Sequence, residues 1–216
     1  DRDMHHVLTD VFNLDAEFYW HEKNLPSDID AVVLPGGFSY GDYLRSGAMA
    51  AYSPIMKDIK LKAEAGVRVL GICNGFQILT ETGLLPGVLM RNRDLKFICR
   101  DVHLQVTNNT SAFTSGYKAG EVIRIPVAHH EGNYFADEKT LKALEDESRI
   151  AFRYCDENGK VNDCANVNGS QHNIAGVFNK SKTVLGMMPH PERLADDQLG
   201  GTGGRAMFDG LVEALA

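Results

Sequence analysis

A cysteine between two glycines is the feature of this sequence best suited to chemistry. Gly71, Cys73 and Gly75 stand where the mainly apolar run 67–72 gives way to apolar residues at helical spacing. A cysteine at an abrupt strand-to-helix turn has the arrangement of a nucleophile elbow, whose glycines permit a cramped backbone. The N-terminus of the helix should lower the thiol pKa and offer N–H groups to an oxyanion. We predict that Cys73 is a nucleophile; the alternative is a buried, inert cysteine.

A second motif could supply the base that such a nucleophile needs. His190 follows the apolar run 184–188 and lies between Pro189 and Pro191. A strand that ends there would bring His190 to the sheet edge that carries the elbow, and the prolines would restrict the backbone around it. Glu192 could reach the second ring nitrogen and fix the tautomer. The alternative is a surface turn in which His190 and Glu192 face water.

Paired glycines follow another apolar run. Residues 31–34 lead into Pro35, Gly36 and Gly37, so these glycines should also lie at the carboxyl edge of the sheet. Because glycine has no Cβ, the backbone N–H groups can turn toward a substrate carbonyl. We expect the N–H groups of Gly37 and Asn74 to form an oxyanion hole; the alternative is a plain glycine turn.

The rest of the sequence predicts the elements that position these residues. Strand-like and helix-like segments alternate through the first 85 residues, which indicates parallel βαβ units in a doubly wound sheet. Longer strands with looser alternation follow, which suggests an antiparallel extension. Besides the helix after Cys73, the expected helices are 3–12, 54–65, 140–147 and 205–215. The expected strands are 16–20, 31–34, 67–72, 95–106, 121–127, 150–154, 174–178 and 184–188.

We therefore predict one α/β domain over residues 1–216, with a flavodoxin-like, doubly wound and mostly parallel sheet. Helices should cover both faces of this sheet, beside the antiparallel extension. A sheet of this type normally opens with a strand that feeds the first helix, whereas this sequence begins almost at that helix. We expect a further strand of the sheet upstream of Asp1.

Composition argues against several classes of function. The sequence is 44% hydrophobic and 24% charged, as is usual for a soluble globular protein. A net charge of −7 without any basic stripe argues against a nucleic-acid partner, and no apolar run approaches the roughly 20 residues that span a bilayer. The four cysteines show no metal-ligand spacing, which favours free thiols in the cytoplasm. They are Cys73, Cys99, Cys155 and Cys164.

Five motifs, read together, resemble one family. The pattern of a glycine-rich oxyanion strand, a G-x-C-x-G elbow and a later H-x-E resembles the class I, or triad, glutamine amidotransferases. The finer motifs are similar to those of the small, separate glutaminase subunits of phosphoribosylformylglycinamidine synthase, an enzyme of de novo purine biosynthesis. These motifs are PGGFSYGDYLRSGAMA (35–50), GICNGFQIL (71–79), LKFICR (95–100), PVAHHEGN (126–133) and GMMPHPER (186–193).

The resemblance implies that Cys73, His190 and Glu192 form a triad that hydrolyses L-glutamine through a cysteinyl thioester. It also implies substrate-binding roles for Gly36 and Gln77. The ammonia would pass to a synthetase subunit that converts formylglycinamide ribonucleotide to formylglycinamidine ribonucleotide. That partner would use ATP and magnesium in a complex with a small accessory subunit, whereas this chain would need no cofactor.

The segment 38–48 should lie near the oxyanion strand. It carries Tyr40, Tyr43 and Arg45, and tyrosine and arginine are common at protein interfaces. We predict that this segment docks the synthetase and that docking completes the oxyanion hole. The alternative is a packed loop that shields the site.

Two positions depart from the family pattern, and one motif resembles a metal site. Ser46 stands where many relatives carry cysteine, and His130 where they usually carry glycine; we expect both changes to tune activity. His129, His130 and Glu131 are consecutive, but adjacent histidines cannot easily share a metal and no third ligand has suitable spacing. We therefore predict no metal site.

Two other functions remain open. One is a cysteine-dependent hydrolase or stress protein on a related flavodoxin-like sheet, which would not call for the His190–Glu192 pair or the glycine turn. The other is an inactive scaffold that only binds the synthetase, which the intact Cys73, His190 and Glu192 argue against.

Overall fold

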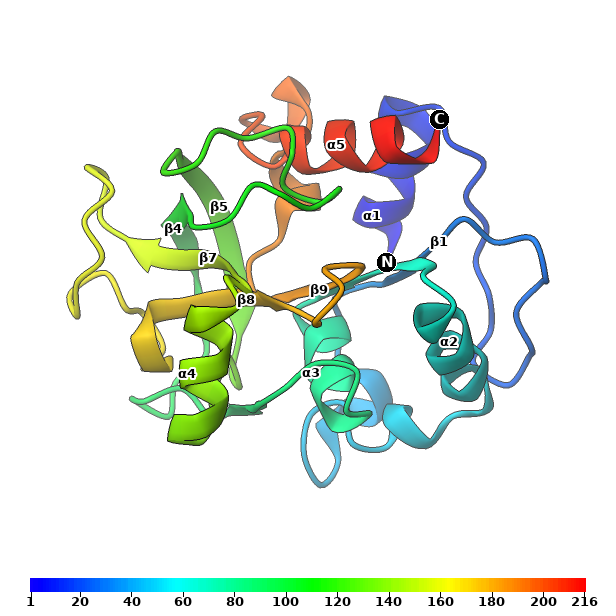
Figure 1. Ribbon diagram of the computed structural model, residues 1–216, viewed down its shortest axis with the longest axis horizontal. Helices are drawn as coiled ribbons and strands as arrows, with labels where there is room; N and C mark the ends of the chain where they lie inside the picture. The colour runs from blue at the N-terminus through cyan, green and yellow to red at the C-terminus, as the bar shows by residue number, and fades with distance from the viewer.

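The computed structural model describes residues 1–216 and has a central sheet with helices on both faces (Figure 1). The seven-stranded sheet has the order β1-β2-β9-β8-β7-β4-β5, and β3 pairs with β6 separately. The strands are β1 Ala31–Leu34, β2 Arg68–Ile72, β3 Val88–Met90, β4 Ile98–Val106, β5 Val122–His129, β6 Asn133–Phe135, β7 Ile150–Cys155, β8 Ile174–Phe178 and β9 Val184–Met187. The α-helices are α1 Arg2–His6, α2 Pro54–Glu64, α3 Asn74–Glu81, α4 Glu138–Asp146 and α5 Arg205–Leu215.

Three neighbouring strands form the parallel part of the sheet. β1 pairs with β2 and β2 pairs with β9, with Val32 opposite Val69 and Val69 opposite Val184. Because parallel strands end at the same edge, the segments that follow them meet there. These segments begin at Pro35, Cys73 and Met188, so the fold gathers all three predicted motifs at one edge.

The other four strands form the predicted antiparallel extension, which is larger than the parallel part. β9 pairs with β8, β8 with β7, β7 with β4 and β4 with β5, all antiparallel. No crossover helix separates β4 from β5 or β8 from β9, so these consecutive strands pair as hairpins. The α/β class is confirmed, although most strand pairs are antiparallel rather than parallel.

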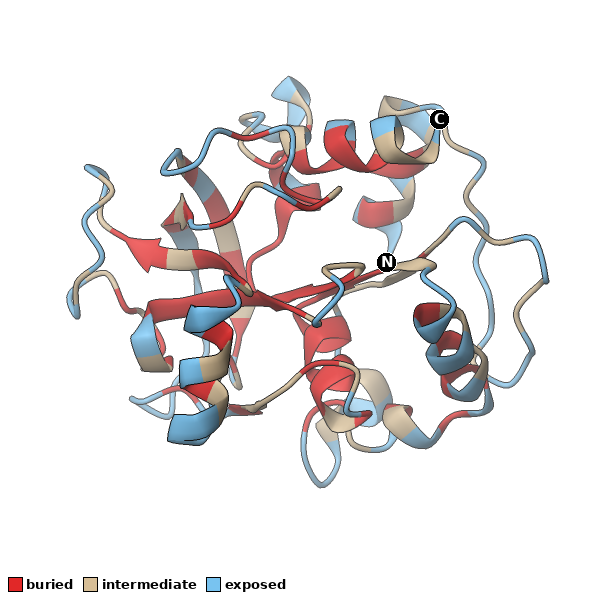
Figure 2. Cartoon of the chain, in the orientation of Figure 1, coloured by how far each residue is buried: buried red, intermediate tan, exposed pale blue.

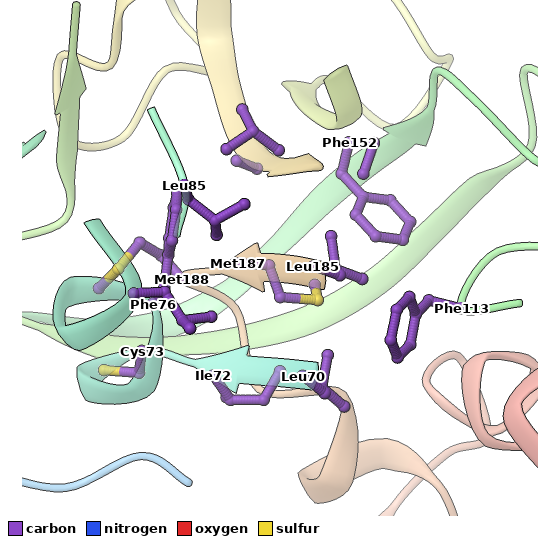
Figure 3. Close-up of a cluster of buried hydrophobic side chains, with 14 of the residues drawn as sticks. Leu70, Ile72, Cys73, Phe76, Leu85, Phe113, Phe152, Leu185, Met187 and Met188 are labelled. Atoms are coloured by element: carbon purple, nitrogen blue, oxygen red, sulfur yellow. The ribbon is translucent and has the colours of Figure 1, made fainter. Parts of the chain in front are cut away.

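The helices bury one continuous core against the sheet. α1 and α5 cover one face, and α2, α3 and α4 cover the other (Figure 1). The buried residues concentrate on the sheet and on the inward faces of the helices (Figure 2). Figure 3 shows this core beside the elbow, where Leu70 and Ile72 of β2 lie near Phe76 of α3 and Met187 of β9. The nucleophile position is thus built on a closely packed, rigid support.

The N-terminal region differs from the prediction. The segment 16–20 forms no strand, because no strand lies beside it and the side chains of Phe18 and Trp20 are exposed. It is held by α1 instead, since the His5 ring stacks on Phe18 and its Nε2 lies 3.1 Å from the Ala16 carbonyl oxygen. The predicted helix 3–12 appears as α1 followed by a π-helical turn over Val7–Val11. The short pair β3 and β6 was not predicted.

None of the helices combines the length and the apolar character that crossing a bilayer requires.

Candidate active site

Cys73 occupies the turn between β2 and α3. Its backbone adopts φ 52° and ψ −105°, a conformation that residues other than glycine rarely adopt. Gly75 lets the helix approach β1, because a Cβ there would collide with the carbonyl oxygen of Leu34. The Cys73 N–H donates to the Met187 carbonyl oxygen at 2.8 Å, which joins the turn to β9. The structure therefore places Cys73 at a strained strand-to-helix elbow, as the glycine spacing predicts.

The thiol of Cys73 is buried, and burial has the largest effect on its pKa. Burial raises the pKa of Cys73 to about 12, and the charge of Glu192 acts in the same direction. The Asn74 N–H at the start of α3 opposes this rise in pKa, but it contributes less than the loss of solvent. The helix N-terminus therefore lowers the thiol pKa as predicted, but burial outweighs this effect and the net pKa is raised. A protonated thiol needs a neighbouring base before it can attack.

His190 and Glu192 form a buried pair. The Nδ1 atom of His190 lies 2.7 Å from Oε1 of Glu192, and both side chains are at most 5% exposed. Because the carboxylate can only accept, Nδ1 carries the proton and donates it. Nε2 of His190 has no partner in the protein, so its lone pair is free to accept a proton. The His190 N–H donates to the Pro126 carbonyl oxygen at 2.8 Å, which fixes the turn to β5.

Gly36 brings the three motifs together. A Cβ on Gly36 would lie 2.6 Å from Cε1 of His190 and 3.6 Å from Cβ of Cys73, so only glycine fits between them. These three residues border a cavity of about 290 Å³. The cavity is also lined by Asp1, Gly37, Phe38, Phe97, Ala128 and Arg193. The alternative of a solvent-exposed His–Glu turn does not describe this arrangement, because both side chains are buried. Cys73 is buried as well, so its role as the nucleophile remains a prediction.

The two residues predicted to supply the oxyanion hole both lie near Cys73. Gly37 lines the cavity directly after β1, and the Asn74 N–H faces the Cys73 sulfur from the first turn of α3. The Asn74 side chain joins the two segments, because its Oδ1 accepts a hydrogen bond from the Ser39 N–H at 3.1 Å. The two segments that carry the predicted donors therefore form one connected unit, and their role as an oxyanion hole remains a prediction.

Gln77 lies one turn beyond the elbow, as predicted, but its amide is already engaged. Its Oε1 accepts from Nδ2 of Asn74 at 2.9 Å, and its Nε2 donates to the Glu131 carbonyl oxygen at 2.7 Å. Gln77 is buried, so in this structure it fastens the segment after β5 to α3. Direct binding of substrate by Gln77 remains a prediction.

The predicted interface residues differ among themselves. Tyr40 and Tyr43 are exposed, Tyr43 at 75%, so they are available to a partner. The guanidinium of Arg45 instead pairs with Glu81 of α3 at 2.7 Å.

Of the two departures from the family pattern, Ser46 is buried and its N–H lies 3.3 Å from Oε2 of Glu131. His130 is exposed.

His129, which the sequence suggested only as a possible metal ligand, is buried beside the site. Its Nδ1 lies 3.1 Å from Oδ1 of Asn92, an atom that also accepts from the Gly132 N–H. Nε2 of His129 has no partner. Burial lowers the pKa of His129 to about 4, and the charge of His190 adds to the effect, so the ring is neutral at pH 7. The alternation of buried residues along β5 assigns position 129 to the inward face, and this signal could have found it.

His129 should make the protein less stable in mild acid. The folded-state pKa near 4 lies below the unfolded value of 6.5, so the unfolded chain binds the proton first. The contribution of His129 is complete above about pH 6.5 and decreases as the pH falls toward 4. We expect its titration to lower the free energy of unfolding by about 2 kcal/mol between pH 7 and pH 5. Urea titrations at the two pH values measure this change.

The matched variant is His129→Asn, which keeps a donor near Asn92 and removes the titrating ring. The pH dependence of its unfolding free energy should be smaller than that of the wild type by this amount. Equal pH dependence in the two proteins would show that His129 is not held neutral.

The structure holds no group of three or more His, Cys, Asp or Glu side chains that could bind a metal ion.

An elbow cysteine and a buried His–Glu pair, set at the ends of neighbouring parallel strands, are the arrangement that the class I glutamine amidotransferase pattern implies. Residues 11–200 match the model of the CobB/CobQ-like glutamine amidotransferase domain. The chain belongs to this family, and within it to the group of subunits named PurQ.

Relatives and solved structures support this assignment along the whole chain. The chain is 59% identical to phosphoribosylformylglycinamidine synthase subunit PurQ of Rhodospirillum rubrum, over 100% of this chain and 94% of the relative. It is 56% identical to the PurQ subunit of Bradyrhizobium diazoefficiens, over 100% of this chain and 93% of the relative. The structure of PurLQS from Thermotoga maritima matches with a TM-score of 0.88 and 41% identity, over 100% of this chain and 93% of that chain.

Proposed function

We propose that this chain is the glutaminase subunit of phosphoribosylformylglycinamidine synthase. It hydrolyses L-glutamine and supplies ammonia for the conversion of formylglycinamide ribonucleotide to formylglycinamidine ribonucleotide in purine biosynthesis. The chain is 56% to 59% identical to two PurQ subunits along its whole length, and this similarity supports the assignment. The observation that carries the chemistry is the meeting of Cys73, Gly36 and His190 at one cavity. Membership of the amidotransferase family disfavours the alternative of an unrelated cysteine hydrolase.

In the proposed reaction, Nε2 of His190 takes the proton from the Cys73 thiol, and the thiolate attacks the side-chain amide carbon of glutamine. The N–H groups of Gly37 and Asn74 stabilise the oxyanion of the tetrahedral intermediate. His190 then returns the proton to the leaving nitrogen, so that ammonia departs and a γ-glutamyl thioester remains on Cys73. Water attacks the thioester with His190 as base, which gives glutamate and restores the thiol.

Glu192 supports both proton transfers. Its carboxylate keeps the proton of His190 on Nδ1, so that Nε2 faces the reacting atoms. When His190 carries the transferred proton, the buried carboxylate stabilises the resulting imidazolium. Cys73 depends on His190 as a base, because its raised pKa makes the resting thiol a poor nucleophile.

Ammonia is useful to the pathway only if it reaches an acceptor before it becomes ammonium in water. We therefore propose that the chain assembles with an ATP- and magnesium-dependent synthetase subunit and a small accessory subunit, and needs no cofactor of its own. The Thermotoga maritima structure is a PurLQS assembly. Exposed aromatic residues near the cavity, including Tyr40 and Tyr43, offer a surface for the synthetase. The four free cysteines suit the cytoplasm.

A diazo-ketone analogue of glutamine tests the proposal. The analogue should add one equivalent of mass to the chain in complex with the synthetase, and peptide mapping should place it on Cys73. Cys99 and Cys164 are exposed and serve as internal controls, since a non-specific reagent would label them first. Excess glutamine should protect Cys73. Labelling of the exposed cysteines alone, or none, would contradict the proposed function and favour an inactive scaffold.

A further inference from the structure

The oxyanion loop, residues 36–47, is fastened to both ends of α3. At the first residue of the helix, Oδ1 of Asn74 accepts from the Ser39 N–H at 3.1 Å. At the last residue, Oε2 of Glu81 accepts from Nη2 of Arg45 at 2.7 Å. A helix of eight residues is about 12 Å long, so the loop follows its whole length.

The middle of the helix is also in direct contact with the loop. A Cβ on Gly47 would lie 2.7 Å from the backbone nitrogen of Ile78 and 2.8 Å from the carbonyl carbon of Gln77. Gly47 has φ +82°, which favours glycine on conformational grounds as well. The loop backbone at Gly47 therefore lies directly against the backbone of α3, at a point between the Ser39–Asn74 and Arg45–Glu81 hydrogen bonds.

Glu81 is an unusual residue for its position. It ends α3, where the helix dipole disfavours a negative charge, and the last turn of this helix contains no basic residue. Its side chain is only 10% exposed, so water solvates the carboxylate poorly. Arg45 supplies the compensating charge from the loop. The Arg45 side chain is half exposed, so the pair differs from an ordinary exposed ion pair, which contributes little, on the carboxylate side only.

The loop backbone needs such support. Tyr40, Asp42 and Leu44 have φ values of 54°, 56° and 68°, a region that costs free energy for residues with a Cβ. A loop with three such residues keeps its conformation only where its surroundings impose it. Its contacts with α3, the helix that follows Cys73, provide part of this support.

We propose that Arg45 and Glu81 are positioning residues for the oxyanion hole, an inference that rests on the proposed function. The ion pair holds the loop against α3, so that the Gly37 N–H keeps its position relative to the Asn74 N–H. The ion pair thereby stabilises the transition state of glutamine hydrolysis and leaves the binding of glutamine and of the synthetase unchanged. The predicted role of Arg45 as an anchor for the synthetase stays a prediction, which the following test distinguishes from the positioning role.

The test uses Arg45→Met and Glu81→Gln in complex with the synthetase subunit. Each variant should lower kcat for glutamine hydrolysis about tenfold, because small displacements of oxyanion donors are costly. KM for glutamine and the Kd for the synthetase should not change. The swapped double variant, Arg45→Glu with Glu81→Arg, should recover much of the lost kcat. Arg124→Met is the control, since Arg124 pairs with Asp101 at 2.7 Å on the exposed surface.

Two results would overturn the proposal. Weaker synthetase binding by Arg45→Met but not by Glu81→Gln would show that Arg45 contacts the partner. An unchanged kcat in folded Glu81→Gln would show that the pair does not position the loop. If Arg45→Met fails to fold, Arg45→Gln replaces it, since glutamine removes the charge that faces Glu81 but keeps a polar side chain. Absence of glutamine hydrolysis in the wild-type complex would instead count against the proposed function.

Discussion

Cys73→Ser should abolish glutamine-dependent synthesis by the complex and leave ammonia-dependent synthesis intact. The serine hydroxyl is less acidic and less nucleophilic than the thiol, and the same burial that raises the pKa of Cys73 would disfavour an alkoxide. By comparison with other acyl-transfer sites, we expect the glutamine-dependent kcat to fall by about 10⁴-fold or more. The measurement is product formation with glutamine and, separately, with ammonium chloride at high pH.

The matched control for this variant is Cys155→Ser. Cys155 is also a buried free cysteine, on β7, so its substitution tests the effect of burying a hydroxyl without touching the elbow. It should retain both activities. Residual glutamine-dependent activity in Cys73→Ser above a few per cent would argue that another group forms the thioester, and loss of both activities would indicate a damaged complex.

Glu192→Gln should lower kcat for glutamine hydrolysis by about 10³- to 10⁴-fold while the fold is retained. Glutamine has nearly the shape of glutamate, but its amide nitrogen can only donate. When that nitrogen faces His190, Nδ1 must accept and the ring proton moves to Nε2. Nε2 could then no longer take the proton from Cys73. Glu192 is buried beside His190, so water cannot easily replace the lost acceptor.

The control for this variant is an exposed pair of the same chemistry. Nδ1 of His172 lies 2.9 Å from Oε1 of Glu145, and both side chains are more than 40% exposed. Glu145 also accepts from Nη2 of Arg153 at 2.7 Å. Glu145→Gln weakens both contacts but should leave kcat within twofold, since Glu145 does not line the cavity and exposed pairs contribute about 1 kcal/mol or less to stability. A Glu192→Gln variant with kcat within tenfold of the wild type would contradict the assigned role.

The parts of the site that follow from local sequence were predictable. The elbow is set by Gly71 and Gly75 around Cys73, and the parallel strands bring residues 36 and 190 to the same edge. Those relations depend on chain direction and glycine spacing, which a sequence displays directly. The α/β class followed for the same reason.

The parts that depend on distant packing were not predictable. The pKa of Cys73 is raised because residues far along the chain cover the sulfur, and no local motif reports that burial. The pairing of Arg45 with Glu81 joins residues 36 positions apart. The segment 16–20 has strand-like composition, yet a strand also requires a neighbour, and contacts with His5 prevail instead.

The position of β5 has a consequence for association between molecules. β5 is the last strand of the sheet, and the exposed carbonyl groups of such a strand are a template on which another chain can pair. Here the Pro126 carbonyl oxygen accepts from the His190 N–H, and the Ala128 carbonyl oxygen lies 3.7 Å from the Cys73 sulfur. The residues assigned to catalysis thus occupy this edge themselves. Assembly of the catalytic centre and protection against strand-to-strand aggregation are the same event at this end of the sheet.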